Sequence, residues 1–439
     1  MGYMKRWIQC GLTCMLPLGL ALAAVGEEAV TVGDRLEPLV DNALIDSLTG
    51  TQHVLQTPPC AGPVMRFDAP WEGRYCGYVT IFRDGEIVRM YYRGLPEAGK
   101  DGSDTEVTCY AESPDGITWS KPSLKLFEAH GTLENNIILA HQAPYSHNFA
   151  PFKDARPDCP AEERYKALAG TRETGLAAFV SADGIHWRLA QKDVLHGGAF
   201  DSQNVSFWSE TEQCYVVYFR TYSEGEWKGY RWVSRATSKD FYHWDPAVVM
   251  DKGDAPWEHI YTNQTQPYFR APHLYIAVAA RFMPGRRVVS PETAKALGIE
   301  GAYGDDCSDN VLMTSRGGNR YDRTFMEGFI RPGIGPEHWT SRTNYPACGL
   351  VSTGDKEMSV YVQADYGQPA AHLLRYTLRP DGFASVRAPY AGGEMLTKPL
   401  IFAGNALHLN FSTSAAGGIR VEIQDASGAP LDGFRLEDS

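Results

Sequence analysis

After its first 24 residues, the sequence has no apolar run near the roughly 20 residues that a membrane-spanning helix needs. It also has no Cys-x-x-Cys pair among its nine cysteines, so a cysteine-rich zinc site or a thioredoxin-like redox centre is not indicated. Positive charge is scarce as well: the net charge is −12, and an acidic surface does not attract nucleic acid. The sequence therefore predicts a globular protein that binds no nucleic acid.

The first residues have the pattern of an export signal. Lys5 and Arg6 precede an apolar stretch that ends in "LALAAVG", which predicts cleavage after Ala23 and a secreted or periplasmic protein without a membrane attachment. A signal anchor is the alternative. Cleavage would leave an odd number of cysteines, and a Cys60–Cys76 disulfide has no support from spacing alone.

Composition favours an all-β fold. Aromatic residues make up 12% of the chain, and 43 Gly with 27 Pro suit many short strands joined by tight turns. Alternating apolar and polar residues in "IVRMYYRG" and "YVVYFRTY" have the period of half-buried strands.

One turn is written three times, as "SPDGITW" at 113–119, "SADGIHW" at 181–187 and "SKDFYHW" at 238–244. Ser and Asp side chains cap the backbone of such a turn, and the Trp can pack between neighbouring sheets, so these residues are expected to be structural. Repetition of strand-rich units about 60 residues long is typical of a β-propeller. We expect five blades, near 65–127, 130–195, 197–250, 258–330 and 340–390.

The chain is therefore expected to divide into four parts. These are a signal peptide (1–23), an N-terminal segment that packs on the propeller or on the tail (24–60), the five-bladed β-propeller (61–392), and a partial C-terminal β-sandwich-like segment (393–439). The last part is predicted from short alternating strands with hairpin turns, and it is short for a complete sandwich.

The repeated turns, "MYYRG" and this domain order resemble the five-bladed propeller glycosidases of glycoside hydrolase families 32, 43, 68 and 117. The phrases "PWEG", "FDSQN", "NQTQPYFRAPH" and "TSRGG" resemble those of a secreted bacterial branch. The resemblance implies a secreted enzyme that hydrolyses glycosidic bonds. Because the Asn-Asp-Pro-Asn and Glu-Cys motifs of invertases are absent, it transfers no catalytic residue.

In a propeller, the innermost strand of each blade lines a central funnel whose mouth binds ligands. Five segments begin polar and turn apolar as such strands would, from "PWEGRYCGYVTIF" in the first blade to "SRTNYPACGLVST" in the last. We expect their polar residues and nearby arginines to bind the substrate: His147, Asn148, Gln203, Asn204, Asn263, Gln266, Arg270, Arg316 and Arg342.

Glycoside hydrolysis needs two carboxyl groups across the scissile bond. Asp201 is the first candidate, because "DSQN" gathers a carboxylate and two amides at the start of an apolar strand. Glu72, Asp154 and Glu327 are candidates for the second group. For each of these residues a structural role, such as a turn cap or an ion pair, is the alternative, and for Glu327 it would be a pair with Arg323 or Arg331.

Arginines are dense between residues 316 and 342, which favours a uronic or sulfated sugar, although arginines that tie blades together are equally compatible. The leading hypothesis is an exo-acting glycoside hydrolase. A sialidase-like hydrolase and a non-catalytic carbohydrate-binding propeller are the alternatives. No residue spacing calls for a cofactor or a catalytic metal, and a structural Ca²⁺ in the funnel remains open. The sequence does not fix the sugar, the linkage or the oligomeric state.

Overall fold

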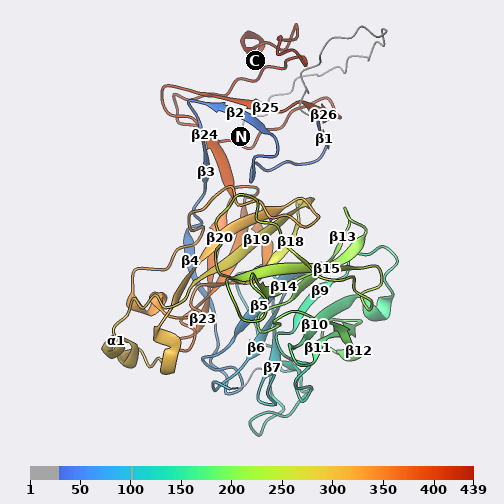
Figure 1. The fold of residues 1–439 in the computed structure, drawn as a ribbon, viewed down its shortest axis with the longest axis vertical. Coiled ribbons are helices and arrows are strands. Elements are labelled where there is room, and N and C mark those ends of the chain that lie inside the picture. The colour runs from blue at the N-terminus through green and yellow to red at the C-terminus, as the bar shows by residue number, and fades with distance from the viewer. Residues whose placement is uncertain (1–28, 100–101) are drawn as a thin grey trace. The chain divides into compact units, whose positions relative to one another are not determined.

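The computed structural model describes residues 29–99 and 102–439, and within these it is nearly all β-structure (Figure 1). The predicted signal peptide lies outside the described residues. The chain forms two compact units: Leu55–Phe383 is the larger, and the segments on either side of it, up to Val54 and from Ala384, make the smaller.

The larger unit contains strands that pair into antiparallel sets along the chain. The first three sets have four strands each, and in all of them the chain runs from one strand to its neighbour. The first set is β5 (Gly77–Asp84), β6 (Ile87–Gly94), β7 (Val107–Ser113) and β8 (Ile137–Leu139). The second is β9 (Ala150–Lys153), β10 (Tyr165–Thr171), β11 (Gly175–Ser181) and β12 (Arg188–Leu195). The third is β13 (Val205–Ser209), β14 (Cys214–Tyr222), β15 (Arg231–Ser238) and β16 (Val248–Val249).

The last two sets are less regular. In the fourth, β17 (Ile260–Thr262) and β18 (Thr265–Tyr268) both pair with β19 (Ala271–Met283), which also pairs with β20 (Cys307–Ser315). The fifth set is β21 (Tyr345–Gly354), β22 (Glu357–Ala364), β23 (His372–Leu378) and β4 (Cys60–Arg66). Its outermost strand therefore comes from the start of the unit, with His372 opposite Arg66.

The repeated turns occupy equivalent places, as predicted. Each follows the third strand of its set, because β7 ends at Ser113, β11 at Ser181 and β15 at Ser238. The hydrogen bonds repeat as well. In the second turn, Ser181 Oγ accepts from the amide of Gly184 at 2.9 Å, and Asp183 Oδ1 accepts from the amides of residues 185 and 186 at 2.9 and 2.8 Å. The first and third turns have the same pattern.

The tryptophans of two of these turns pack against another set. Trp187 lies 6.4 Å from the ring of Tyr91 in β6, and Trp119 lies 6.1 Å from the ring of Tyr361 in β22. The hydroxyls of these two tyrosines donate to the carbonyl oxygens of Gly184 and Gly116 in the turns. The turns thus join neighbouring sets in addition to closing their own.

Short irregular elements interrupt the strands. The fourth set carries an excursion with α1 (Pro291–Ala296) and η2 (Gly301–Gly304), and further 3-10 turns are η1 (Ala161–Glu163), η3 (Pro336–Trp339) and η4 (Leu436–Asp438). In the described residues no helix is long and apolar enough to cross a membrane. Cys60 is exposed, Cys76 is buried, and both are free thiols.

The smaller unit is made of three strand pairs. They are β1 (Val30–Gly33) with β26 (Leu400–Phe402), β2 (Ile45–Thr49) with β25 (Glu394–Thr397), and β3 (Gln52–Leu55) with β24 (Ala384–Arg387). The N-terminal segment therefore pairs with the tail. From Ala403 onward the chain has no strand and one isolated bridge, and Leu407, Leu409 and Phe411 are each more than 40% exposed. The predicted sandwich-like segment is not confirmed, because its alternating apolar residues cover no opposing sheet.

Candidate functional site

The backbone is in the left-handed region near an early strand of every set: within β5, before β9, before β13, between β17 and β18, and before β21. The residues with positive φ are Tyr78 (51°), Asn148 (54°), Phe200 (51°), Gln264 (49°) and Asn344 (71°). A side chain beyond glycine at such an angle stores about 1 kcal/mol or more of strain, which is kept where the surroundings enforce it. Five recurrences at one level of the fold mark this level as a place where geometry matters.

Hydrogen bonds tie these strand starts together. Gln203 donates to Thr80 Oγ1 at 2.5 Å, and Gln264 donates both to Gln203 Oε1 at 2.7 Å and to the carbonyl of Pro346 at 2.8 Å. These bonds join the first, third, fourth and fifth sets. Asn148, just ahead of the second set, donates to the carbonyl of Phe200 at 3.5 Å. Polar residues near the starts of these strands are therefore linked to one another.

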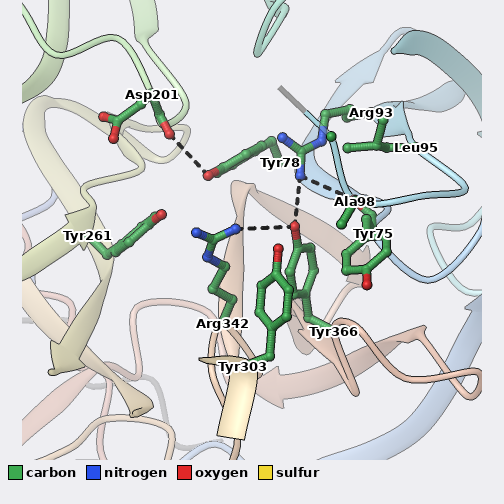
Figure 2. A pocket seen from close by; sticks show the side chains of 11 residues that line it. Tyr75, Tyr78, Arg93, Leu95, Ala98, Asp201, Tyr261, Tyr303, Arg342 and Tyr366 are labelled. Carbon is green, nitrogen blue, oxygen red and sulfur yellow. Dashed lines mark hydrogen bonds between the residues drawn. The ribbon is translucent and has the colours of Figure 1, made fainter. Parts of the chain in front are cut away.

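A pocket of about 60 Å³ opens at this level (Figure 2). Its described lining is dominated by phenol and guanidinium groups, with one carboxylate, that of Asp201. The lining residues are Tyr75, Tyr78, Arg93, Leu95, Ala98, Gly99, Asp201, Tyr261, Tyr303, Arg342 and Tyr366. Such a surface has few apolar groups and many hydrogen-bond donors.

Two arginines hold one tyrosine between them. Arg93 donates to the hydroxyl of Tyr366 at 3.1 Å and to the carbonyl of Tyr75 at the same distance, and its guanidinium lies 4.6 Å from the ring centre of Tyr78. Arg342 donates to the same Tyr366 hydroxyl at 3.5 Å. Figure 2 shows the guanidinium of Arg342 between Tyr261 and Tyr366. Both guanidiniums therefore lie at the pocket, bonded to phenol and carbonyl oxygens.

The carboxylate side of the pocket is built on an ion pair. Arg220 is 2% exposed and donates from Nε to Asp201 Oδ1 at 2.9 Å, while the Asp201 side chain is 21% exposed. The same guanidinium lies 4.2 Å from the ring centre of Tyr261. A buried guanidinium favours the charged form of its carboxylate partner. Asp201 is therefore fixed by an ion pair at the edge of the pocket.

Tyr261 is an unusual phenol in this environment. Burial alone would raise its pKa, but the guanidiniums of Arg342 and Arg220 outweigh burial and lower it. In contrast, burial and the neighbouring Tyr261 raise the pKa of Tyr78. The hydroxyl of Tyr261 is thus the more acidic of the two, and it is suited to exchange a proton with a ligand.

The structure brings several predicted residues to this level. Asp201 and Arg342 line the pocket, and Asn148 and Gln203 belong to the hydrogen-bond network. Asn204 is fully buried, and neither its amide nitrogen nor its amide oxygen has a hydrogen-bond partner among the described residues. These positions remain candidates for substrate contact.

Three further predicted residues have local partners at the same level. Asn263 Oδ1 accepts from the amide of Thr265 at 3.0 Å, and the amide oxygen of Gln266 accepts from the backbone of the fifth set. His147 is buried and bonds to Glu106 at 2.8 Å. Burial works against the charge of Glu106, but His147 outweighs it and lowers the Glu106 pKa. These side chains support the strand starts.

The predicted second carboxyl groups do not reach the pocket. Glu72 is fully buried, with its carboxylate 2.5 Å from the Tyr92 hydroxyl and 2.7 Å from Lys121 Nζ. Asp154 is bonded to the Tyr215 hydroxyl at 2.6 Å. Glu72 lies in a turn ahead of β5 and Asp154 directly follows β9, and their charges are used inside and between sheets, which the local sequence does not reveal.

The remaining predicted residues are also elsewhere. Glu327 is exposed and does not line the pocket, while its expected partner Arg323 pairs with Glu258 at 2.7 Å. Arg270 pairs with Asp381 at 2.9 Å. Arg316 follows the last residue of β20 and is not among the lining residues.

Arg93, Arg220 and the pocket tyrosines were not predicted as site residues. A sequence signal for the arginines exists. Each ends a Tyr-aromatic-Arg run near the end of a second strand, "YYR" in β6 and "YFR" in β14. Such a position lies opposite the start of the first strand, as the pairing of Arg93 with Gly77 shows. Reading second strands together with first strands would have found both residues.

Among the described residues, no group of three or more His, Cys, Asp or Glu side chains is placed to hold a metal ion. No protein-family model matches the chain, and no curated protein matches it.

Several solved structures are similar over most of the chain. One, titled a glycoside hydrolase, is 15% identical and covers 76% of this chain and 95% of its own, with a TM-score of 0.49. Another is described as a member of the GH130 family of mannoside phosphorylases, which contains glycoside hydrolases that target beta-1,2 mannosidic linkages in Candida mannan. It is 14% identical over 81% of this chain and 99% of its own, with a TM-score of 0.42.

A beta-1,2-mannobiose phosphorylase from Listeria innocua is 8% identical over 72% of this chain and 94% of its own, with a TM-score of 0.46. These comparisons do not confirm the specific resemblance to families 32, 43, 68 and 117. At 8–15% sequence identity, these three similarities do not assign the chain to a family.

Proposed function

We propose that the protein is an exo-acting glycoside hydrolase whose substrate binds in the pocket around Asp201. The observation that carries this proposal is the position of Asp201: a carboxylate held by a buried arginine, partly open to solvent, at the edge of a pocket rich in phenols and guanidiniums. Carboxylates in this kind of setting act as nucleophile, base or charge stabiliser in glycoside hydrolysis. The small pocket suits a single terminal sugar.

The proposal includes a five-bladed propeller, with one blade for each strand set. Two features support it: the first strands of the sets meet through hydrogen bonds, and β4 completes the fifth set as a closing strand would. Closure of a ring of sheets removes exposed edges from the circle. The pocket then lies at the mouth of the funnel.

The substrate in this proposal carries an anionic group, a uronic carboxylate or a sulfate. Arg93 and Arg342 support this choice, because their guanidiniums face the pocket and are bonded to phenol and carbonyl oxygens. Guanidiniums bind planar or tetrahedral anions through parallel hydrogen bonds.

The reaction also needs a proton donor for the leaving oxygen, and we assign this role to Tyr261. Asp201 accepts a hydrogen bond from the buried guanidinium of Arg220, so in this proposal it acts as a base or nucleophile. Tyr261 has the lowered pKa and faces the same pocket. As the glycosidic C–O bond breaks, the phenol gives its proton to the leaving oxygen, while Asp201 either attacks the anomeric carbon or takes a proton from the attacking water.

The test is turnover of chromogenic glycosides, uronides and sulfated glycosides, and of plant and algal oligosaccharides, by the purified chain. Asp201→Asn should lower kcat on any confirmed substrate by about 10²–10⁴-fold per folded molecule. Glu72→Gln is the matched control and should keep kcat. Near-normal turnover by the Asp201 variant, or an equal loss in both variants, would remove Asp201 from the mechanism.

A second candidate is phosphorolysis, favoured by the presence of two arginines and one carboxylate in the described lining. In that reaction inorganic phosphate is the nucleophile, so no carboxylate base is needed, and the products include a sugar phosphate. Adding phosphate to the turnover assay separates the two reactions. Ligand binding without turnover in either condition would instead support the non-catalytic carbohydrate-binding alternative.

A further inference from the structure

Four aromatic side chains gather beside the pocket, on the loop between β14 and β15 and on the segment before β17. We call Tyr222, Trp227, Tyr230 and Trp257 the aromatic platform. Trp227 is 51% exposed, Trp257 40% and Tyr230 38%. Exposed large aromatics in a cluster are uncommon on a soluble surface and mark a place of interaction.

The platform rings are ordered by contacts with one another. The rings of Tyr230 and Trp257 are stacked, with centroids 6.1 Å apart and planes 15° apart. The ring of Tyr222 lies 5.2 Å from that of Trp227. The inner edge of Trp257 packs against the buried Trp232 at 5.4 Å. The faces are therefore held in place before any ligand arrives, which lowers the entropic cost of binding.

Arg231 connects the platform to the pocket. Its guanidinium lies 5.8 Å from the ring centre of Tyr222 on the platform and 5.7 Å from the ring centre of Tyr261 in the pocket. Burial raises the pKa of Tyr222, and the charges of Arg220 and Asp201 also act on this phenol. Arg231 therefore lies close both to a platform ring and to a ring of the pocket.

Polar groups lie between the platform rings. His259 contacts the ring of Tyr230 at 4.8 Å and accepts from the amide of Arg231 through Nδ1 at 3.1 Å. Burial and Arg231 lower the His259 pKa, so the ring is neutral near pH 7 and carries its proton on Nε2. A surface of aromatic faces with hydrogen-bond donors between them fits a ligand that has both C–H faces and hydroxyls.

We propose that the aromatic platform binds the continuing sugar residues of a glycan whose terminal residue occupies the pocket. Sugar rings would stack on Trp227 and on the Tyr230–Trp257 pair. The proposal rests on the proposed function for the direction of the chain into the pocket. The platform proposal goes beyond the proposed function because it names the ligand as an oligosaccharide. A monosaccharide could not contact both the pocket and the platform.

Native electrophoresis through gels cast with polygalacturonate, chondroitin sulfate or arabinoxylan tests the platform without turnover. The wild type should be retarded in at least one gel, and Trp227→Ala with Trp257→Ala should raise its apparent Kd about tenfold, as expected when two anchoring aromatics are lost. Phe269→Ala is the matched control, because Phe269 is 44% exposed in the same unit but lies on the β18–β19 hairpin. Thermal unfolding of each variant verifies that it is folded.

The outcomes separate this proposal from the proposed function. Retardation that is kept by Asp201→Asn and lost by the tryptophan double variant supports the platform, whatever the turnover result. Equal retardation of the double variant, the control and the wild type overturns it, and so does the absence of retardation in all three gels. A change in oligomeric mass of the double variant with unchanged retardation would assign the rings to contact between copies of the chain.

Discussion

Replacing Asp201 by Asn should destabilise the larger unit as well as stop the proposed reaction. The two side chains are nearly isosteric, and on the sequence alone the change is expected to leave folding intact. The structure changes this expectation because Arg220, 2% exposed, depends on Asp201 for its charge partner. Arg220 also donates a long hydrogen bond, 3.4 Å, to the carbonyl of Tyr261.

The magnitude follows from this burial. Removing one partner of a buried ion pair costs about 3–5 kcal/mol. Two features reduce that figure here: the Asn amide oxygen still accepts from Arg220, and the Asp201 side chain is 21% exposed, so water screens part of the lost attraction. We expect a loss of about 2 kcal/mol in the free energy of unfolding.

The assay is urea unfolding followed by tryptophan fluorescence, in a double-mutant cycle with Arg220→Met. The double variant has no buried charge, so it should lose less than the sum of the two single losses, with a coupling of about 1–2 kcal/mol. The pair does not stabilise the unit if the unfolding free energy of Asp201→Asn is within about 0.5 kcal/mol of the wild-type value and the loss in the double variant equals the sum of the two single losses. Kinetic constants of the variant must be given per folded molecule.

Three other outcomes are expected. Trp187→Ala should cost about 3 kcal/mol in unfolding free energy, because its ring contacts Phe149 at 4.9 Å, while glycan affinity of the folded fraction stays unchanged; a selective loss of affinity would contradict its structural role. Glu72→Gln should cost about 1–3 kcal/mol without changing kcat, and a fall in kcat with unchanged urea midpoint would refute this. Burial works against the charge of Asp240, but its hydrogen bonds with His243 and nearby amides lower its pKa to about 2. Because this pKa lies below the unfolded value of about 4, ionised Asp240 stabilises the fold above about pH 4, and this stabilisation is lost as the pH falls through about 2. If the unfolding free energy of an Asp240→Asn variant falls with acid as steeply as that of the wild type, Asp240 does not contribute in this way.

The sequence predicted what is local and repeated. The turns at 113–119, 181–187 and 238–244 were placed because Ser and Asp bond to backbone groups two or three residues away, within one segment. The polar starts of the first strands were placed because their pattern changes from polar to apolar at one point. Asp201 and Arg342, which line the pocket, were selected from this same change in pattern.

What failed depends on partners far along the chain. Glu72 and Lys121 are separated by 49 residues, and Asp154 and Tyr215 by 61, so neither local sequence shows that the carboxylate is already engaged. Arg93 and Arg220 sit on second strands, and their relevance appears only when strand pairing is known. A carboxylate next to aromatic residues in the sequence can have a catalytic or a structural role. The burial of its side chain, which the local sequence does not show, distinguishes the two roles.

The closing strand β4 has a consequence for synthesis. It leaves the ribosome before β5 to β23 of the larger unit, but its partner β23 is among the last strands of that unit to be made, as the pairing of His372 with Arg66 shows. Until then the strand's backbone donors and acceptors are open to wrong partners, in the way of any unpaired edge. The smaller unit waits longer still, since β1 pairs with β26 near the end of the chain. A nascent chain that stops short of residue 372 can thus fold sheets one after another but cannot close the fifth set, and holdase chaperones are expected to bind it at β4.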